Sequence, residues 1–525
     1  MAAALKGLNI VVCGSGNGAQ AAAGLLASQG HAVNVLLGAR YAARAADLAA
    51  ALAAAGGDIT VSSPAGEARG RVAGVTSHAA SVTPGADVVV VSLPGPAIPG
   101  MLAELAPHLG PHQLVLLLMG TGPANYMSLA DAVAAAQGPG APLPVYAAAK
   151  TLPWACRLVG PGRVRVGGAK TALTFAAAPG APALLKAMLP PLLGSLFPGT
   201  AFELEDSPLE GVLGIPYGLM LNPIVHPGVM YGTWADWDGT PLPEAPLFYH
   251  AATPTAADAI DGLAADARAV VGALCEALGV NFPAGITDPR STLAGMYRGQ
   301  VDDDSTTLSL LRTNAAYAGV RHPMAASPAA PGDTAVTGGG LVPDFSSRLL
   351  TEDLPCGLVP LRGVAEILGV ATPWVDRVIT WAQGVMGREY LVGGKLAGHD
   401  VASSDAPQRF GARTVEELAL TAARPAGGLA TAAEAAPAPA ELASEFWEEP
   451  ISQTLSVRAP SVGAEGFGTA FALDMPSAER APHLLPGRLL NKACSVIVAS
   501  AKPPLGAPVR RLNRSVTLPT LAAAM

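Results

Sequence analysis

The sequence predicts an α/β domain built on a parallel sheet, followed by a mainly α-helical domain and a low-complexity C-terminal extension. Three observations support this fold class. Short apolar runs alternate with helical stretches in the first part of the chain, long helical segments replace them after about Glu203, and alanine and proline dominate beyond about Val401. We therefore expect one domain at residues 1–200, a second at 203–400, and a linker with a weakly ordered extension at 401–525.

The first domain alternates strands and helices. Each expected strand is a continuous apolar run, which is typical of a parallel sheet covered on both faces. The first two expected helices each end next to a glycine, a common terminator of helices. In chain order we expect strands at 8–13, 32–37, 87–93 and 114–119, and helices at 19–29, 41–55, 97–109 and 181–197.

The second domain is expected to be built from helices, since its apolar residues follow long helical stretches. The extension is different, because its alanine- and proline-rich part cannot bury enough apolar surface to fold by itself. The expected helices of the second domain are 256–278, 306–319, 361–368 and 374–386.

Composition excludes several classes of protein. The chain has 525 residues, too many for one compact core, and only 14% of them are charged, against about 25% in typical domains. Its apolar runs are interrupted by proline and glycine before they reach the ~20 residues of a membrane-spanning helix. The net charge of −8 argues against a nucleic-acid partner, which normally requires a basic surface. We expect neither a membrane nor a nucleic acid as a partner.

The cysteines are scattered and form no pair at metal-ligand spacing, so neither a zinc site nor a disulfide framework is expected. Too few residues precede the first expected strand for a targeting peptide. Both features favour a cytoplasmic protein. The five cysteines are Cys13, Cys156, Cys275, Cys356 and Cys494.

A glycine-rich loop joins the first expected strand to the first helix and fits the pattern G-x-G-x-x-A. Gly14 permits the tight turn, Gly16 lets the backbone approach a pyrophosphate, and Ala19 lets the helix pack closely on the sheet. The loop therefore predicts a Rossmann dinucleotide-binding domain, the alternative being an ordinary strand-to-helix turn. The cofactor-binding candidates in this loop are Gly14, Ser15, Gly16, Asn17, Gly18 and Ala19.

The end of the second expected strand lacks the carboxylate that usually binds the adenosine ribose. Arg40 stands there instead, with Arg44 one helical turn further on. A guanidinium can accept a 2′-phosphate, so the sequence favours NADP(H), with NAD(H) as the alternative coenzyme. The alternative interpretation of Arg40 is a solvated surface residue.

Further motifs make the sequence resemble the octopine/nopaline (opine) dehydrogenase family, from about Leu8 to about Leu391. The glycine loop is common to many enzymes, whereas the motifs around His226 and Asp353 are much more specific and occur in the order typical of the family. The motifs are Val-Ser-Leu-Pro at 91–94, Thr-Leu-Pro-Trp-Ala-Cys-Arg at 151–157, Asn-Pro-Ile-Val-His-Pro at 222–227, and Asp-Phe-Ser-Ser-Arg-Leu-Leu-Thr-Glu-Asp-Leu-Pro-Cys-Gly-Leu at 344–358.

The resemblance implies catalysis in the cleft between a Rossmann domain and a helical domain. Enzymes of this kind condense an amino acid with a 2-oxo acid and reduce the imine with the nicotinamide hydride. The family's catalytic histidine corresponds to His226, its partner aspartate to Asp353, and its arginine for the keto acid to Arg348. Leu93 and Pro94 are expected at the cofactor.

The chemistry requires such groups independently of the family. Forming and reducing an imine needs a residue that exchanges protons near neutral pH, and histidine is suited to this. A carboxylate on the second ring nitrogen fixes the tautomer. A guanidinium orients a substrate carboxylate through two hydrogen bonds, while the cofactor carries the hydride.

Structural alternatives exist for each of these residues. Asp353 and its neighbour Glu352 can be ordinary helix-terminal acids, and Arg348 can be a surface ion-pair partner. Asn222 can bind the substrate or hold the turn before a proline. Lys150 precedes the Thr-Leu-Pro-Trp motif, and in the amino-donor pocket it would disfavour a cationic donor.

Two other functions remain open at this point. A carbonyl reductase like ketopantoate reductase or glycerol-3-phosphate dehydrogenase shares the two-domain plan but usually relies on a lysine. A non-catalytic dinucleotide sensor would not need His226, Arg348 or Asp353, and all three are present. We expect an amino acid and a 2-oxo acid as substrates, and a monomer or a homodimer.

Overall fold

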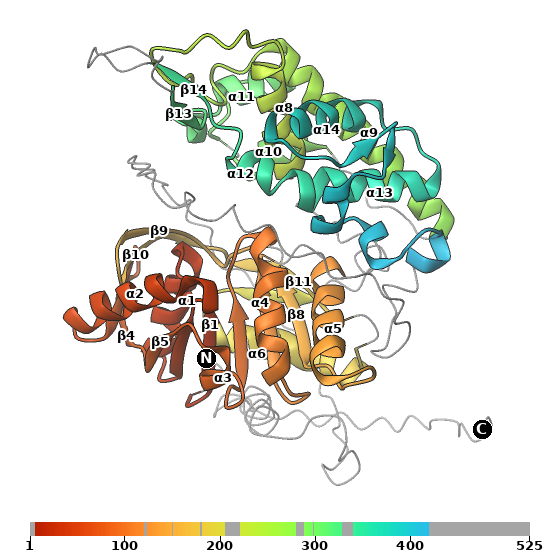
Figure 1. The fold of residues 1–525 in the computed structure, drawn as a ribbon. Helices are drawn as coiled ribbons and strands as arrows, with labels where there is room; N and C mark the ends of the chain where they lie inside the picture. The colour runs from red at the N-terminus through yellow and green to blue at the C-terminus, as the bar shows by residue number, and fades with distance from the viewer. Residues whose placement is uncertain are drawn as a thin grey trace, which may run out of the picture.

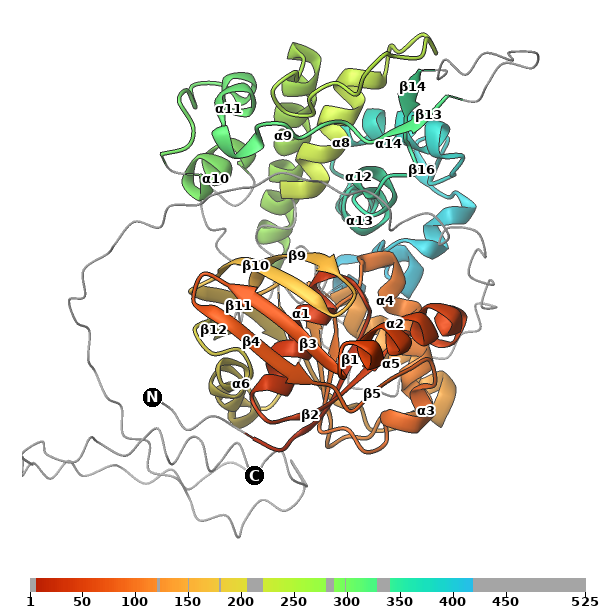
Figure 2. The ribbon, with the colours of Figure 1, turned by 90° about the vertical axis from the view of Figure 1, so that its left-hand side faces the viewer.

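The computed structural model describes residues 6–119, 123–149, 151–178, 181–204, 221–279, 288–297, 299–327 and 340–418. These residues form an α/β domain and a helical domain, seen below and above in Figure 1 and again in the rotated view of Figure 2. The two-domain plan predicted from the sequence is confirmed.

The first domain is built on an eight-stranded sheet with the strand order β12-β11-β8-β7-β6-β1-β2-β5. All pairs from β5 to β8 are parallel, while β11 runs antiparallel to β8. The order from β5 to β8 is that of a Rossmann sheet. The strands are β1 (Asn9–Cys13), β2 (Ala32–Leu36), β5 (Gly74–Thr76), β6 (Val88–Val91), β7 (Leu114–Leu118), β8 (Val145–Ala149), β11 (Ala172–Ala177) and β12 (Ala201–Leu204).

Helices cover both faces of this sheet, and two separate hydrophobic clusters form there. One face packs against α1 (Asn17–Ser28), α2 (Ala42–Ala54) and α6 (Ala183–Leu196). The other packs against α3 (Ala79–Val82), α4 (Ile98–Leu105) and α5 (Pro123–Gln137). Burial on both faces explains why the central strands are uninterrupted apolar runs.

A second, four-stranded sheet, which the sequence analysis did not predict, lies over α1. Its order is β4-β3-β10-β9. A methyl group added at Gly70 of this sheet would lie 2.1 Å from the carbonyl oxygen of Gly24 in α1. Helix α1 is therefore rich in alanine and glycine because it is confined between two sheets. The strands are β3 (Asp58–Ser63), β4 (Gly66–Arg71), β9 (Trp154–Gly160) and β10 (Arg163–Ala169).

The second domain is mainly helical, and α8 packs closely against α9. Methyl groups added at Gly228 and Gly232 of α8 would lie 2.7 Å or less from Ile260 and Ala256 of α9. The helices are α8 (Leu221–Trp234), α9 (Pro254–Leu278), α10 (Pro289–Met296), α11 (Thr307–Thr313), α12 (Arg348–Thr351), α13 (Val359–Leu368) and α14 (Pro373–Met386). Two hairpins pair β13 (Met324–Ala326) with β14 (Leu341–Pro343) and β15 (Leu391–Val392) with β16 (Lys395–Leu396).

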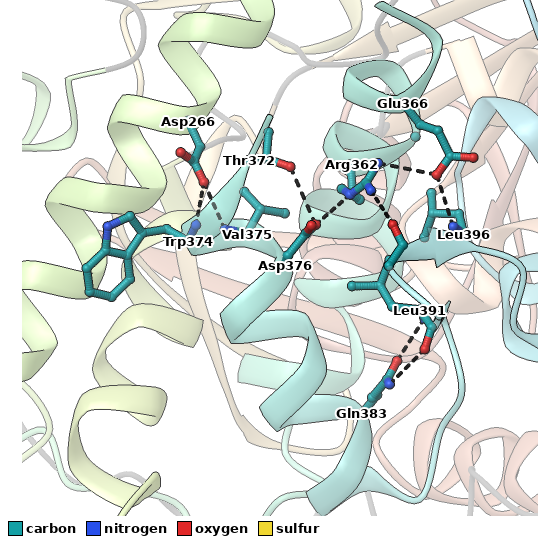
Figure 3. Close-up of polar contacts among 12 residues, drawn as sticks. Asp266, Arg362, Glu366, Thr372, Trp374, Val375, Asp376, Gln383, Leu391 and Leu396 are labelled. Carbon is teal, nitrogen blue, oxygen red and sulfur yellow. Dashed lines mark hydrogen bonds and ion pairs between the residues drawn. The ribbon is translucent and has the colours of Figure 1, made fainter. Parts of the chain in front are cut away.

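A buried arginine helps to hold this domain together (Figure 3). The guanidinium of Arg362 in α13 contacts Asp376 of α14, Glu366, and the carbonyl oxygen of Gly394 in the β15–β16 turn. Asp266 of α9 accepts hydrogen bonds from the first backbone N–H groups of α14 at 2.7 and 2.9 Å. The buried charge of Arg362 is compensated by these carboxylates, and three elements are fixed relative to one another.

The observed domain limits differ from those predicted. Strand β12 belongs to the first sheet although it lies beyond residue 200. Residues 401–418 pack on the helical domain, because Gln408 donates to the carbonyl oxygen of Gly363 at 2.7 Å and the backbone of Asp405 donates to that of Pro355 at 2.8 Å. The predicted extension beyond residue 418 lies outside the described residues. Within the described part of the chain, no helix is both long enough and apolar enough to span a bilayer.

Candidate active site

The glycine loop has the geometry of a phosphate-binding turn. Gly14 has a φ of 118°, and a methyl group there would lie 2.7 Å from the carbonyl oxygen of Ser92. Gly16, the N-cap of α1, carries no side chain to bond the first N–H groups of the helix, and the first turn contains no acidic residue. These features leave the helix N-terminus suited to an anion, so the loop fits a dinucleotide pyrophosphate.

The other predicted loop residues hold this turn in place. The Asn17 side-chain oxygen accepts from the backbone N–H of Leu158 in β9 at 2.7 Å, so this side chain is committed to the protein. The carbonyl oxygen of Ser15 accepts from Gln20 at 2.7 Å, and Ala19 is buried against the sheet. The loop can therefore offer backbone rather than side-chain groups to a cofactor.

The loop lies beside two other segments at the carboxyl ends of the strands. A methyl group added at Gly18 would lie 2.7 Å from Leu152 and from the hydroxyl of Ser92. A methyl group added at Gly14 would lie 3.1 Å from the side chain of Leu93. Pro94 is the N-cap of the short helix η2 (Gly95–Ala97). Ser92 and Leu93, which follow β6, thus adjoin the glycine loop.

Two charged residues lie at the end of β2. Arg40 is exposed in the short helix η1 (Ala39–Tyr41), and its guanidinium lies 4.8 Å from the ring centre of Tyr41. A carboxylate is also present, since Glu104 of α4 accepts a hydrogen bond from the backbone N–H of Ala39 at 2.8 Å. Glu104 was not predicted from the sequence, because it lies on α4 and not on the strand whose end it contacts.

His226 and Asp353 form a direct pair in the helical domain. The Nδ1 atom of His226 lies 2.8 Å from Oδ2 of Asp353, and the two side chains are 18% and 13% exposed. The ring of Phe248 contacts the imidazole edge to face at 6.0 Å between ring centres. The pair is thus mostly enclosed while the imidazole keeps access to solvent.

Close helix packing brings the pair together although 127 residues separate its members. His226 lies in α8, whereas Asp353 directly precedes a π-helical turn, η5 (Leu354–Leu358), that joins α12 to α13. A methyl group at Gly357 of this turn would lie 2.4 Å from the ring of Pro223 in α8. Gly357 therefore allows the contact that sets His226 against Asp353, and π turns are frequent at functional sites.

Burial raises the pKa of the Asp353 carboxyl, and the neighbouring charge of Glu352 raises it further. The hydrogen bond from His226 opposes this shift, as does the charge of Arg348. The carboxylate is therefore stabilised mainly by its two basic neighbours. Such an arrangement places a carboxylate where it can orient the imidazole of His226.

Arg348 and Asn222 surround this pair. Arg348, the first residue of α12, is 51% exposed and forms an ion pair with Glu352 one turn later. The other oxygen of Glu352 accepts from the backbone N–H of Gly95, at 3.0 Å, in the first domain. Asn222 is exposed one turn before His226 on α8. Glu352 thus links the segment that carries Arg348 and Asp353 to the loop that follows β6.

The structure brings the predicted residues together in two groups, the glycine loop with the residues after β6 and His226 with Asp353, and Glu352 joins the second group to Gly95 beside the first. Lys150 lies outside the described residues. A different lysine contacts the described part of the Thr-Leu-Pro-Trp motif: Lys170 donates to the hydroxyl of Thr151 at 2.7 Å, and burial lowers the pKa of Lys170. Among the described residues, no group of three or more acidic, histidine or cysteine side chains could hold a metal ion.

Together, a Rossmann domain and a helical domain that carries a His–Asp pair define a two-domain dinucleotide-dependent oxidoreductase. Comparison with known proteins agrees. Residues 216–386 match the family model of the NAD/NADP octopine/nopaline dehydrogenase α-helical domain. Octopine dehydrogenase of Pecten maximus is 32% identical over 421 residues, 78% of this chain and 98% of that protein. Tauropine dehydrogenase of Arabella iricolor is 32% identical over 66% of this chain and 82% of that protein.

Solved structures support the same assignment. The structure of octopine dehydrogenase with NADH and L-arginine matches with a TM-score of 0.67 and 31% identity, covering 81% of this chain and all of that chain. The chain belongs to the octopine/nopaline dehydrogenase family. It is an NAD(P)-dependent opine dehydrogenase, an oxidoreductase acting on CH–NH bonds, and the predicted class of enzyme is confirmed.

Proposed function

We propose that His226 and Asp353 carry out the proton transfers of the opine reaction and that Arg348 orients the 2-oxo acid. The amine of an amino acid adds to the keto carbon, water leaves to form an imine, and reduction gives a secondary amine. The bound dinucleotide supplies the hydride for this last step. The observation that carries the proposal is the His226–Asp353 pair, which is enclosed but accessible and lies next to Glu352, whose side chain contacts Gly95 of the first domain.

The contact with Asp353 assigns the roles of the two imidazole nitrogens. A carboxylate at 2.8 Å from Nδ1 favours a proton on that nitrogen, which leaves Nε2 to exchange protons with the substrates. At Nε2, His226 takes a proton from the attacking amine and returns one to the departing hydroxyl. Asp353 stabilises the imidazolium that forms between these steps.

Arg348 is suited to bind a carboxylate because it already binds one. Its guanidinium contacts Glu352, and it remains about half exposed. A substrate carboxylate can join or replace Glu352 through a second pair of N–H groups. We assign this role to the 2-oxo acid, and Asn222, one helical turn from His226, to a hydrogen bond with a substrate.

The donor is proposed to be a neutral or acidic amino acid. Lys150 adjoins the Thr-Leu-Pro-Trp motif in sequence, and Lys170 places an ammonium group 2.7 Å from the hydroxyl of Thr151. Positive charge at this segment, which borders the glycine loop through Leu152, disfavours a cationic donor. Octopine dehydrogenase has been solved with L-arginine, so donor choice would differ from that relative.

The coenzyme is a nicotinamide dinucleotide, and two side chains at the end of β2 have opposite effects on a 2′-phosphate: the sequence-based preference for NADP(H) rests on Arg40. The exposed guanidinium of Arg40 is able to accept a 2′-phosphate at the end of β2. Glu104 at the same strand end opposes a phosphate, because its charge has the same sign.

We also propose a cytoplasmic enzyme that is a monomer or a homodimer. Support for the compartment comes from the cysteines: those within the described residues are unpaired and Cys13, Cys156 and Cys275 are buried. Analytical ultracentrifugation at several concentrations measures the oligomeric state, and a tetramer would contradict it.

The test is coenzyme oxidation, followed by absorbance, on a grid of amino acids against pyruvate, 2-oxoglutarate and glyoxylate. Oxidation should require both substrates and fall at least ~10²-fold in His226→Ala. His399→Ala, a change at a largely exposed histidine, is the matched control and should keep wild-type rates. Oxidation with a keto compound alone would contradict imine reduction, and rapid turnover of arginine would contradict the proposed donor class.

A further inference from the structure

A carboxylate from another element stands at the strand end where the sequence has none. Glu104 lies in α4, yet its Oε2 accepts from the backbone N–H of Ala39, directly after β2, at 2.8 Å. A methyl group added at Gly38, whose φ is 85°, would lie 3.0 and 3.1 Å from the two oxygens of Glu104. The absence of a side chain at Gly38 makes room for this carboxylate.

The carboxylate lies between the ends of β1 and β2. Burial raises the pKa of the Cys13 thiol at the end of β1, and the nearby charge of Glu104 raises it further. Gly14, the next residue, donates to the carbonyl oxygen of Leu36 at 2.8 Å, so the two strand ends adjoin. In Rossmann domains the adenosine ribose lies here, beside the first glycine of the loop and the end of the second strand.

Among the contacts of the described residues, none joins the guanidinium of Arg40 to the carboxylate of Glu104. Arg40 instead lies over the ring of Tyr41, its own neighbour. Glu104 is partly buried beneath the strand end, whereas Arg40 is exposed. A ribose at this position would therefore approach the carboxylate from the side on which it is open.

We propose that Glu104 selects the coenzyme: it accepts hydrogen bonds from the adenosine ribose, repels a 2′-phosphate, and makes NAD(H) the preferred coenzyme. The inference rests on the dinucleotide site of the proposed function. It reverses the preference that Arg40 alone suggests, because an acid supplied by α4 fills the role of the acid that β2 lacks.

A purely structural role makes a different prediction. Glu104 satisfies the first N–H group of η1, and an amide at this position can do the same. If the residue only holds the turn, Glu104→Gln is neutral and Glu104→Ala weakens both coenzymes alike. If it selects the coenzyme, Glu104→Gln alters NADPH and NADH in opposite directions.

The experiment titrates the full-length chain with NADH and with NADPH, without substrates, and follows the nicotinamide fluorescence. The wild type is expected to bind NADH at least ~10-fold more tightly than NADPH. Glu104→Gln should shift this ratio ~10- to 100-fold toward NADPH, since a repulsive charge is removed. Adding Arg40→Ala to Glu104→Gln should then weaken NADPH alone. Asp47→Asn, at an exposed position of α2, is the matched charge control and should leave the ratio unchanged.

A wild-type preference for NADPH, or a Glu104→Gln ratio within twofold of wild type, would overturn the inference. Binding of neither coenzyme would overturn it together with the dinucleotide site. Normal NADH binding without turnover of any substrate pair would contradict the proposed function alone, because the titration contains no substrates.

Discussion

Replacing Asp353 by asparagine tests the pair at the centre of the proposed mechanism. The amide keeps the size of the carboxylate but removes its charge and can present an N–H group to His226. Nδ1 of His226 now receives a donor in place of an acceptor, which favours the wrong tautomer. The 2.8 Å contact makes His226 directly sensitive to this exchange.

The expected loss follows from the geometry. The imidazolium and the carboxylate have charge centres roughly 4 Å apart, in a site where the side chains are 18% and 13% exposed. At an effective dielectric constant of about 20 their attraction is about 4 kcal/mol, equivalent to roughly 10³-fold in rate. Stability should not fall, because burial already disfavours the charged carboxylate of Asp353.

The assay compares kcat at saturating amino acid, 2-oxo acid and coenzyme, with coenzyme Kd and Tm measured in parallel. Asp353→Asn should lower kcat ~10³-fold and leave coenzyme Kd and Tm near wild type. Asp258→Asn, at an exposed position of α9, makes the same change in net charge and should retain full activity. A kcat for Asp353→Asn within about threefold of wild type would refute the reasoning.

Three further predictions address the surroundings of the pair. Arg348→Lys should raise KM for the 2-oxo acid about 10- to 100-fold and leave coenzyme Kd unchanged, because a lysine cannot form two parallel hydrogen bonds with a carboxylate. Equal losses of affinity for the 2-oxo acid and for the coenzyme would argue against a carboxylate anchor. Gly357→Ala should destabilise the folded protein by about 1–3 kcal/mol and lower kcat, because the new methyl group meets Pro223 at 2.4 Å. Gly384→Ala is the control and should not lower Tm, because a methyl group at that position meets open space. Identical melting of the two variants would contradict the packing account. Burial lowers the pKa of His322 from 6.5 to about 4. Between pH 6.5 and pH 4, His322 is therefore protonated in the unfolded chain but not in the folded one. The free energy of unfolding should fall by up to about 3 kcal/mol as the pH decreases through this range. This loss of stability, measured by urea unfolding, should be smaller in His322→Gln. The same pH dependence in the variant and the wild type would contradict the role assigned to His322.

Local patterns predicted the elements that depend on local chemistry. The glycine loop, the strands β1, β2, β6 and β7, and long helices such as α9 and α14 were found from residue type and period alone, whereas α5, β8 and α8 were not. The four-stranded sheet was missed because its outer strand β4 is polar and mostly exposed, so no apolar run marks it. Its function is to cover α1, a tertiary relation that a one-dimensional pattern does not contain.

The candidate site depends on contacts between distant segments. The family resemblance paired His226 with Asp353. The spacing of the two residues in the sequence could not predict this pair, because their approach depends on the close packing of Gly357 against Pro223. Glu104 was missed for a similar reason, because it reaches the end of β2 from a helix 65 residues further along the chain. Such residues can be recognised only in the folded structure, where Glu104 of α4 contacts Ala39 directly after β2.

The most direct test of the account is to find where the hydride goes. Coenzyme deuterated at nicotinamide C4 is supplied with an amino acid and a 2-oxo acid that together support turnover, and the product is examined by NMR and mass spectrometry. We predict deuterium on the former keto carbon of a secondary amine, formed only when both substrates are present. Deuterium in a 2-hydroxy acid, formed equally well without the amino acid, would contradict the account.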